Sequence, residues 1–297
     1  MTTSDPLGTG RATYIQLRSR IRIPDRGEIM KAGTRLSIMP FFLVSLLLIP
    51  VLTVITARAQ SGEEAVNTTT SHDPSAFINV VDFIPTIILD LRYFGGHNFI
   101  GSRINGYNAE HTYLTFEAAV ALKNVQEELM SMSLSLKIYD AYRPQRAVDH
   151  FVDWAENLAD TAMKAEFYPE VKKKHLFRDG YIAARSGHSR GSTLDVTIVA
   201  LSSGEEPGFF QNDLQDCRLP AAQRYRDTTI DMGTGYDCFD TLSWTMDGRI
   251  GVQQRANRLL LKTIMERHGF RNYEREWWHY TLIDEPFEET YFDFPIE

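Results

Sequence analysis

The stretch Ser186-Gly-His-Ser-Arg-Gly-Ser-Thr-Leu-Asp-Val-Thr-Ile198 passes from a polar turn into a run where apolar and polar residues alternate. Alternation with a period of two predicts a strand with two unlike faces. The apolar residues from Leu194 onward would build core, and Asp195 would face a polar site. The small and polar residues between His188 and Asp195 are expected to turn the chain, so that both side chains reach one point.

A second polar cluster, Glu276-Trp-Trp-His279, lies near the end of the sequence. Two imidazoles and a carboxylate are a ligand set typical of a zinc ion that keeps one coordination position open. A further carboxylate beside the last ligand suits a general base. We therefore expect one zinc ion per chain, held by His188, Asp195 and His279, with Glu276 as the base of a hydrolase.

This interpretation makes a demand on the backbone around His279. In a regular strand, residues three apart point to opposite faces of the sheet. Glu276 and His279 can serve one site only if the chain approaches the strand through a turn or an irregular segment. The two tryptophans between them would exclude water and raise the pKa of Glu276.

Charge is distributed unevenly along the 297 residues. Residues 1–59 hold eight Lys and Arg against three Asp and Glu, whereas the whole chain has a net charge of −8, which leaves −13 for residues 60–297. An acidic body of ordinary globular composition argues against nucleic acid as a partner.

Residues 36–55 form an apolar run, which Ala57-Arg-Ala59 follows as a small-x-small cleavage pattern. We expect residues 30–59 to be a secretory signal peptide, with an uncleaved signal anchor as the alternative and the only membrane contact. Residues 1–29 would be a basic extension or would precede a true start at Met30. The body would then be periplasmic or otherwise extracytoplasmic, joined by a flexible linker over residues 60–75.

The two cysteines, Cys217 and Cys238, both fall in the exported part. An oxidising compartment favours a disulfide between them. A role as nucleophile or metal ligand stays open as the alternative, although neither cysteine sits in a CxxC pattern or beside a histidine.

Periodicity predicts strands and helices without regular alternation. We expect strands within residues 80–92, 134–138, 194–198 and 276–282, a helix over residues 115–130, a second helix after Pro144, a third over residues 253–267, and an inserted loop over residues 202–231. The residues expected inward on the second helix are Val148, Phe151, Val152, Ala155 and Leu158, and on the third Ala256, Leu259, Leu260 and Ile264. Mixed helices and strands of this kind indicate an α+β fold.

Five motifs in order resemble the zinc D-alanyl-D-alanine dipeptidases of peptidase family M15, the VanX-type enzymes. They are Asp140-Ala-Tyr-Arg-Pro144, the Ser186–Asp195 stretch, Asp231-Met-Gly-Thr-Gly-Tyr-Asp237, Glu276-Trp-Trp-His-Tyr280 and Tyr291-Phe-Asp-Phe-Pro295. The resemblance implies one zinc-peptidase domain over residues 76–297, with a central antiparallel sheet flanked by helices, as in hedgehog and D,D-peptidase domains.

Carried over by position, the resemblance implies roles for further residues. Arg143 would stabilise the oxyanion of the attacked peptide, although a salt bridge to Asp140 is an equally ordinary use of this arginine. Asp237, Tyr93 and Tyr107 would hold the ammonium end of D-Ala-D-Ala. Ser186 would help to bind its carboxylate, and the Ser-Ser-His of the family is Ser-Gly-His here, which removes one hydroxyl.

The motifs and the resemblance lead to three hypotheses about function. The first is hydrolysis of D-Ala-D-Ala in the cell envelope, for peptidoglycan turnover or D-alanine salvage. The second is a murein D,D-carboxypeptidase or endopeptidase that acts on longer peptides. The third is a zinc-stabilised binding module without turnover, which the presence of both Glu276 and Arg143 disfavours.

Overall fold

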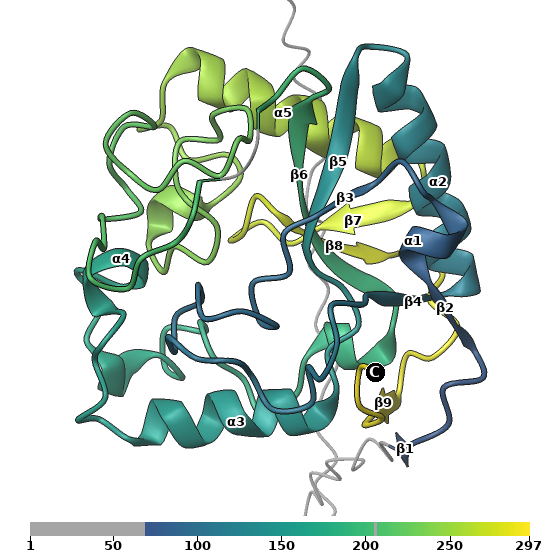
Figure 1. The fold of residues 1–297 in the computed structure, drawn as a ribbon, viewed down its shortest axis with the longest axis horizontal. Coiled ribbons are helices and arrows are strands. Elements are labelled where there is room, and N and C mark those ends of the chain that lie inside the picture. The colour runs from purple at the N-terminus through teal and green to yellow at the C-terminus, as the bar shows by residue number, and fades with distance from the viewer. Residues whose placement is uncertain (1–68, 205–206) are drawn as a thin grey trace, which may run out of the picture. The chain divides into compact units, whose positions relative to one another are not determined.

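The structure is a computed structural model that describes residues 69–204 and 207–297 (Figure 1). The expected extension, signal segment and most of the expected linker lie outside these residues. Thr69–Ser71 form strand β1, which pairs in parallel with β9 (Thr290–Phe292). The predicted linker therefore extends too far, because backbone hydrogen bonds to β9 hold residues 69–71 in a sheet.

A five-stranded sheet forms the centre of the fold, in the order β3-β5-β6-β8-β7. Its strands are β3 (Ile88–Leu89), β5 (Leu134–Asp140), β6 (Thr193–Ala200), β8 (His279–Leu282) and β7 (Phe270–Asn272). Only β3 and β5 pair in parallel; the other three pairs are antiparallel. Helices α2 (Phe116–Met130) and α5 (Val252–Arg267) pack against this sheet (Figure 1). The α+β class and the central antiparallel sheet are confirmed.

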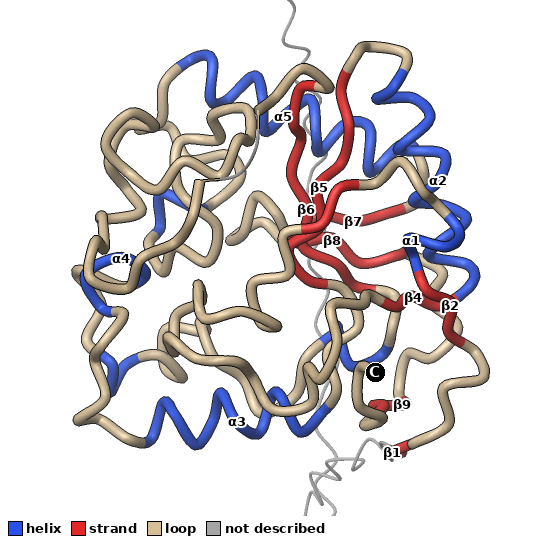
Figure 2. Tube along the Cα trace, in the orientation of Figure 1, coloured by secondary structure: helices blue, strands red, loops and turns tan. Residues whose placement is uncertain are grey.

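Smaller elements surround this sheet. Strands β2 (Phe77–Asn79) and β4 (Tyr113–Thr115) form an antiparallel pair. The remaining α-helices are α1 (Val80–Phe83), α3 (Gln145–Glu156) and α4 (Lys164–Phe167), and 3-10 turns cover Lys173–His175, Gly187–Arg190 and Thr241–Ser243. In Figure 2 the strands gather on one side of the view and long loops occupy the other.

Buried apolar side chains form two clusters, which correspond to these two parts. The first cluster lies between the five-stranded sheet and helices α2 and α5, and includes Leu122, Ile138 and Val196. The second lies among loops and α3, and is rich in aromatic rings such as Phe99, Phe151 and Phe239. Aromatic packing therefore stabilises these chain segments, which have no β-ladder to hold them together.

Several predicted elements match the structure closely. Thr115 is the N-cap of α2, and its hydroxyl accepts a hydrogen bond from the Ala118 amide. The alternating run from Leu134 is β5, and α3 starts directly after Pro144. In the expected 80–92 strand, only Ile88–Leu89 are strand, because residues 80–83 form a short helix capped by the Asn79 side chain.

Helix α5 is rotated from its predicted orientation. The Arg258 guanidinium is buried and donates to the carbonyls of Met232 (2.6 Å) and Trp244 (2.7 Å), which turns that face inward. The buried residues are Arg258, Leu261, Ile264 and Met265, so of the predicted inward set only Ile264 is fully buried. On α3 the prediction likewise fails for Leu158, which lies beyond the end of the helix and is exposed.

The inserted loop contains no helix or strand among its described residues, 202–204 and 207–231. Cys217 in this loop forms a disulfide with Cys238, as predicted, and both residues are buried. Across the part of the chain that the structure describes, no helix is long and apolar enough to cross a membrane.

Candidate metal centre and active-site cleft

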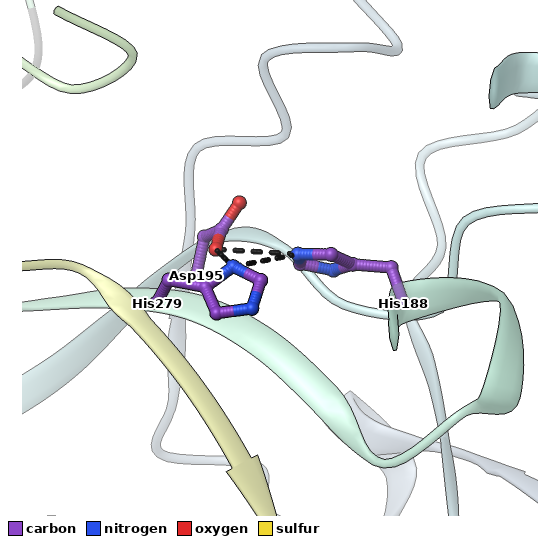
Figure 3. Close-up of side chains that lie close together, drawn as sticks. All are labelled: His188, Asp195 and His279. Atoms are coloured by element: carbon purple, nitrogen blue, oxygen red, sulfur yellow. Dashed lines mark hydrogen bonds and ion pairs between the residues drawn. The ribbon is translucent and has the colours of Figure 1, made fainter. Parts of the chain in front are cut away.

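His188, Asp195 and His279 come together from three separate elements (Figure 3). His188 lies in the 3-10 turn before β6, Asp195 lies in β6, and His279 is the first residue of β8. Asp195 and His279 are directly opposed partners in the β6–β8 ladder. Opposed residues of an antiparallel pair project from the same face, so this register places the two side chains together.

The distances between the three donor atoms fit a tetrahedral zinc site. With bonds of about 2.0–2.1 Å and tetrahedral angles, neighbouring ligand atoms lie about 3.3–3.4 Å apart. His188 Nε2 is 3.3 Å from Asp195 Oδ1 and 3.3 Å from His279 Nδ1, and His279 Nδ1 is 3.1 Å from Asp195 Oδ1. The convergence expected from the sequence is thus present, and these residues could hold one metal ion.

Neighbouring groups orient these donors. His188 Nδ1 lies 2.7 Å from the Ala141 carbonyl oxygen, so it carries the proton and leaves Nε2 free as a ligand. The Tyr236 hydroxyl donates to Asp195 Oδ2 at 2.8 Å, on the oxygen that faces away from the histidines. Burial acts to raise the pKa of Asp195, but His188 and His279 hold that pKa well below its usual value, so the carboxylate is ionised.

Glu276 reaches the same site because the chain turns immediately before β8. The Glu276 amide donates to the Tyr273 carbonyl, and the His279 amide donates to the Glu276 carbonyl, which gives the irregular approach that the sequence demanded. Glu276 Oε2 lies 3.5 Å from His279 Nδ1. Burial in the cleft raises the pKa of Glu276 to about 7, against the lowering effect of His279. A carboxyl group with this pKa can both accept and release a proton near neutrality.

Arg143 lines the same cleft and also forms the salt bridge considered as its alternative use. Its Nε and Nη2 lie 2.9 and 2.8 Å from Asp140 Oδ2, and Nη2 is 3.7 Å from Asp195 Oδ2. The guanidinium also lies over the Tyr93 ring, with its central carbon 4.9 Å from the ring centroid. The two uses are therefore compatible, because Asp140 fixes the Arg143 side chain while its positive charge faces the cleft.

Tyr107 packs edge-to-face against the Tyr93 ring and contacts Asp140. Its hydroxyl donates to Asp140 Oδ1 at 2.6 Å, and its side chain is buried. Tyr107 therefore helps to hold the carboxylate that pairs with Arg143, and its contact with the ammonium end of a substrate stays a prediction.

Asp237 and Tyr93 do lie together in the cleft. The Tyr93 hydroxyl donates to Asp237 Oδ2 at 2.8 Å. Burial and the nearby Asp195 raise the pKa of Asp237 well above its usual value. Ser186 also lines the cleft and caps the turn that carries His188, since its hydroxyl accepts from the His188 amide at 3.3 Å.

The sequence did not predict that Tyr236 donates to Asp195. It also did not predict that Asp140 accepts a hydrogen bond from Tyr107 in addition to its salt bridge with Arg143. Tyr236 and Asp140 lie inside motifs quoted above, but neither periodicity nor spacing shows which ligand a tyrosine hydroxyl reaches. The aromatic wall of the cleft, which includes Phe99, Phe151 and Phe239, was also not predicted.

Comparison with known proteins identifies the family of this chain. The sequence profile of the M15 peptidases described as D-Ala-D-Ala dipeptidase matches residues 74–206 and 221–297. The chain therefore belongs to the D-Ala-D-Ala dipeptidase family. Residues 207–220 of the inserted loop fall outside the match.

Three relatives are similar over most of their lengths, and each is named D-alanyl-D-alanine dipeptidase. The Streptomyces coelicolor protein is 38% identical over 220 residues, which cover 74% of this chain and 98% of the relative. The Enterococcus faecalis protein is 33% identical over 75% of this chain and 98% of its own. The Enterococcus faecium protein is 33% identical over 70% of this chain and 92% of its own.

Proposed function

We propose that this chain is a zinc-dependent dipeptidase that hydrolyses D-Ala-D-Ala in the cell envelope. The observation that carries the proposal is the position of Glu276, whose carboxylate lies 3.5 Å from a donor of the metal-ligand triangle and inside the same cleft as Arg143 and Asp237. A base, a fixed cation and a buried carboxylate around one metal site are the components of peptide hydrolysis.

The donor set favours one zinc ion per chain at His188, Asp195 and His279. Bound there, zinc would supply Lewis-acid polarisation of the peptide carbonyl and increase the acidity of the attacking water.

The chain's own groups perform the remaining work. Glu276 accepts the proton from the attacking water and delivers it to the nitrogen of the leaving D-alanine. Arg143, which Asp140 holds in place, stabilises the negative charge that develops on the carbonyl oxygen. Because the guanidinium is oriented before the substrate arrives, little reorganisation accompanies the reaction.

Substrate recognition depends on a different part of the cleft. Asp237, with its hydrogen bond from Tyr93, would hold the ammonium group, and the approach of that cation favours the ionised carboxylate despite its burial. Ser186 would contribute to binding the carboxylate end. A closed ammonium site selects a free dipeptide over a longer chain, because an acylated amine has no charge to pair with Asp237.

Export is part of the same proposal. The Cys217–Cys238 disulfide supports it, since such bonds persist in oxidising compartments. The apolar run at residues 36–55 and the Ala57-Arg-Ala59 pattern also support it. N-terminal sequencing of the exported protein is expected to start at Gln60; a retained apolar run would mean an anchored protein instead.

The activity is tested by incubating purified protein with D-Ala-D-Ala, L-Ala-L-Ala and N-acetyl-D-Ala-D-Ala, each with and without a chelator. We expect chelator-sensitive release of D-alanine from D-Ala-D-Ala alone. Efficient cleavage of the acetylated substrate would favour a D,D-carboxypeptidase acting on longer peptides. Metal-dependent stability without cleavage of any substrate would favour a binding module.

A further inference from the structure

The inserted loop is covalently joined to the residue that follows Asp237. Cys217 lies in residues 207–220, which the family profile does not match, and its disulfide partner Cys238 is the next residue after Asp237. The bridge therefore links a segment outside the family profile to the proposed ammonium site. Both cysteines are buried, so the disulfide lies in the interior of the structure.

Backbone hydrogen bonds reinforce the link on both sides of Asp237. The Gly235 amide donates to the Cys217 carbonyl at 2.8 Å, and the Phe239 amide donates to the Phe167 carbonyl at 2.7 Å. The Cys217 amide in turn donates to the Glu166 carbonyl at 3.1 Å. The inserted loop and the 235–239 segment are thus fastened to α4 and to each other.

Asp237 has a backbone conformation that needs such support. Its φ is 54°, in the left-handed region that residues with a side chain rarely adopt. That conformation directs the carboxylate toward the Tyr93 hydroxyl and the cleft. A residue held in a disfavoured conformation persists where its surroundings determine it strongly, and the disulfide constrains the backbone at the very next residue.

We propose that the Cys217–Cys238 disulfide is a positioning device for substrate binding, which holds Asp237 against the ammonium group of the dipeptide. Cys217 and Cys238 are positioning residues, since neither lines the cleft. This inference rests on the proposed function and adds a redox-dependent affinity to it. Breaking the bridge weakens substrate binding and leaves the three metal ligands in place, because they lie in β6, in β8 and in the turn before β6.

The test is steady-state kinetics of the full chain with Cys217→Ala and Cys238→Ala together. We expect KM for D-Ala-D-Ala to rise about tenfold, with kcat within about twofold and zinc content unchanged. An unchanged KM would overturn the inference. Phe209→Ala is the matched control: Phe209 lies in the same unmatched segment and stacks on His97, with ring centroids 3.9 Å apart, but it is not joined to Asp237. This control is expected to lower thermal stability without raising KM.

A double-mutant cycle shows whether the bridge acts through Asp237. In the Asp237→Asn background, removing both cysteines is expected to leave KM where Asp237→Asn alone puts it. If the two effects on KM multiply instead, the bridge stabilises the loop in general and the inference fails.

Two further measurements keep the outcomes distinct. If the double-cysteine variant does not fold, the folded wild type is treated with a phosphine reductant, reduction is verified by mass, and the same rise in KM is required. If wild-type protein with the bridge intact hydrolyses no D-Ala-D-Ala, the proposed function fails; if it does and KM does not respond to loss of the bridge, only the present inference fails.

Discussion

The candidate metal centre and the proposed ammonium site lie in one cleft but are built in opposite ways. Asp195 and His279 are opposed residues of the β6–β8 ladder, and the sheet beneath them packs on α2 and α5. Asp237 lies in a loop, which aromatic packing and a disulfide hold in place. In Figure 2, β6 and β8 are drawn as strands, and the chain between β6 and α5 is drawn mostly as loop.

This difference indicates that metal binding and substrate recognition depend on different parts of the structure. Two of the three metal-ligand residues, Asp195 and His279, lie on paired strands, which tolerate little movement, and His188 lies in the turn that leads into β6. Recognition of the substrate is placed on loops, where length and sequence can change without moving the sheet. Changes in the sheet-built centre should therefore alter turnover or metal binding, and changes in the loop-built site should alter KM.

The largest effect is expected from Glu276→Gln, which keeps the shape of the side chain but cannot accept a proton. Turnover should fall by about 10²–10⁴-fold, the usual contribution of a general acid–base group, with zinc retained. Kinetics and metal analysis of the same preparation check this. Near-normal turnover would remove Glu276 from the mechanism.

Arg143→Ala should lower kcat by about 10²–10³-fold, because the developing oxyanion loses its cation. The same change leaves Asp140 without its ion pair, so folding must be checked by thermal denaturation. Arg143→Lys is the control, since it keeps a positive charge beside Asp140. If kcat of the alanine variant stays high while stability falls, the arginine is only a structural ion pair.

Asp237→Asn tests the loop-built side of the comparison. The loss of a charge-assisted hydrogen bond to the substrate ammonium, worth about 1.5–3 kcal/mol, corresponds to a rise in KM of about 10–100-fold. The kcat and zinc content should change much less. A fall in kcat at constant KM would place Asp237 with the chemistry and would break the proposed division.

The smallest effect is expected from Tyr236→Phe, which removes the hydrogen bond to Asp195 Oδ2 and keeps the ring. Loss of one group that orients a metal ligand should lower zinc affinity by about tenfold. Competition with a metal-binding dye measures this affinity. An unchanged affinity would show that the β6 backbone alone orients Asp195.

Prediction from the sequence succeeded where local pattern determines structure. The alternation around Asp195, the Thr115 cap and the Pro144 helix start each depend on neighbouring residues, and each was confirmed. The approach to His279 was also derivable, because one site cannot use Glu276 and His279 from a straight strand.

Prediction failed where distant partners decide. The inward face of α5 depends on loop carbonyls that accept from Arg258, and β1 depends on pairing with β9 at the far end of the chain. The hydrogen bond from the Tyr107 hydroxyl to Asp140 likewise joins residues far apart in the sequence. No periodicity in the sequence carries that information.

The most direct test of the account is the metal content of purified protein, compared between the wild type and Asp195→Ala. Asp195 is the ligand that pairs with His279 across the ladder and lies beside His188, so the site should fail without it. We expect one zinc ion per wild-type chain and almost none in the variant, with hydrolysis of D-Ala-D-Ala lost in parallel. Equal zinc content in the two proteins would contradict the metal centre described here.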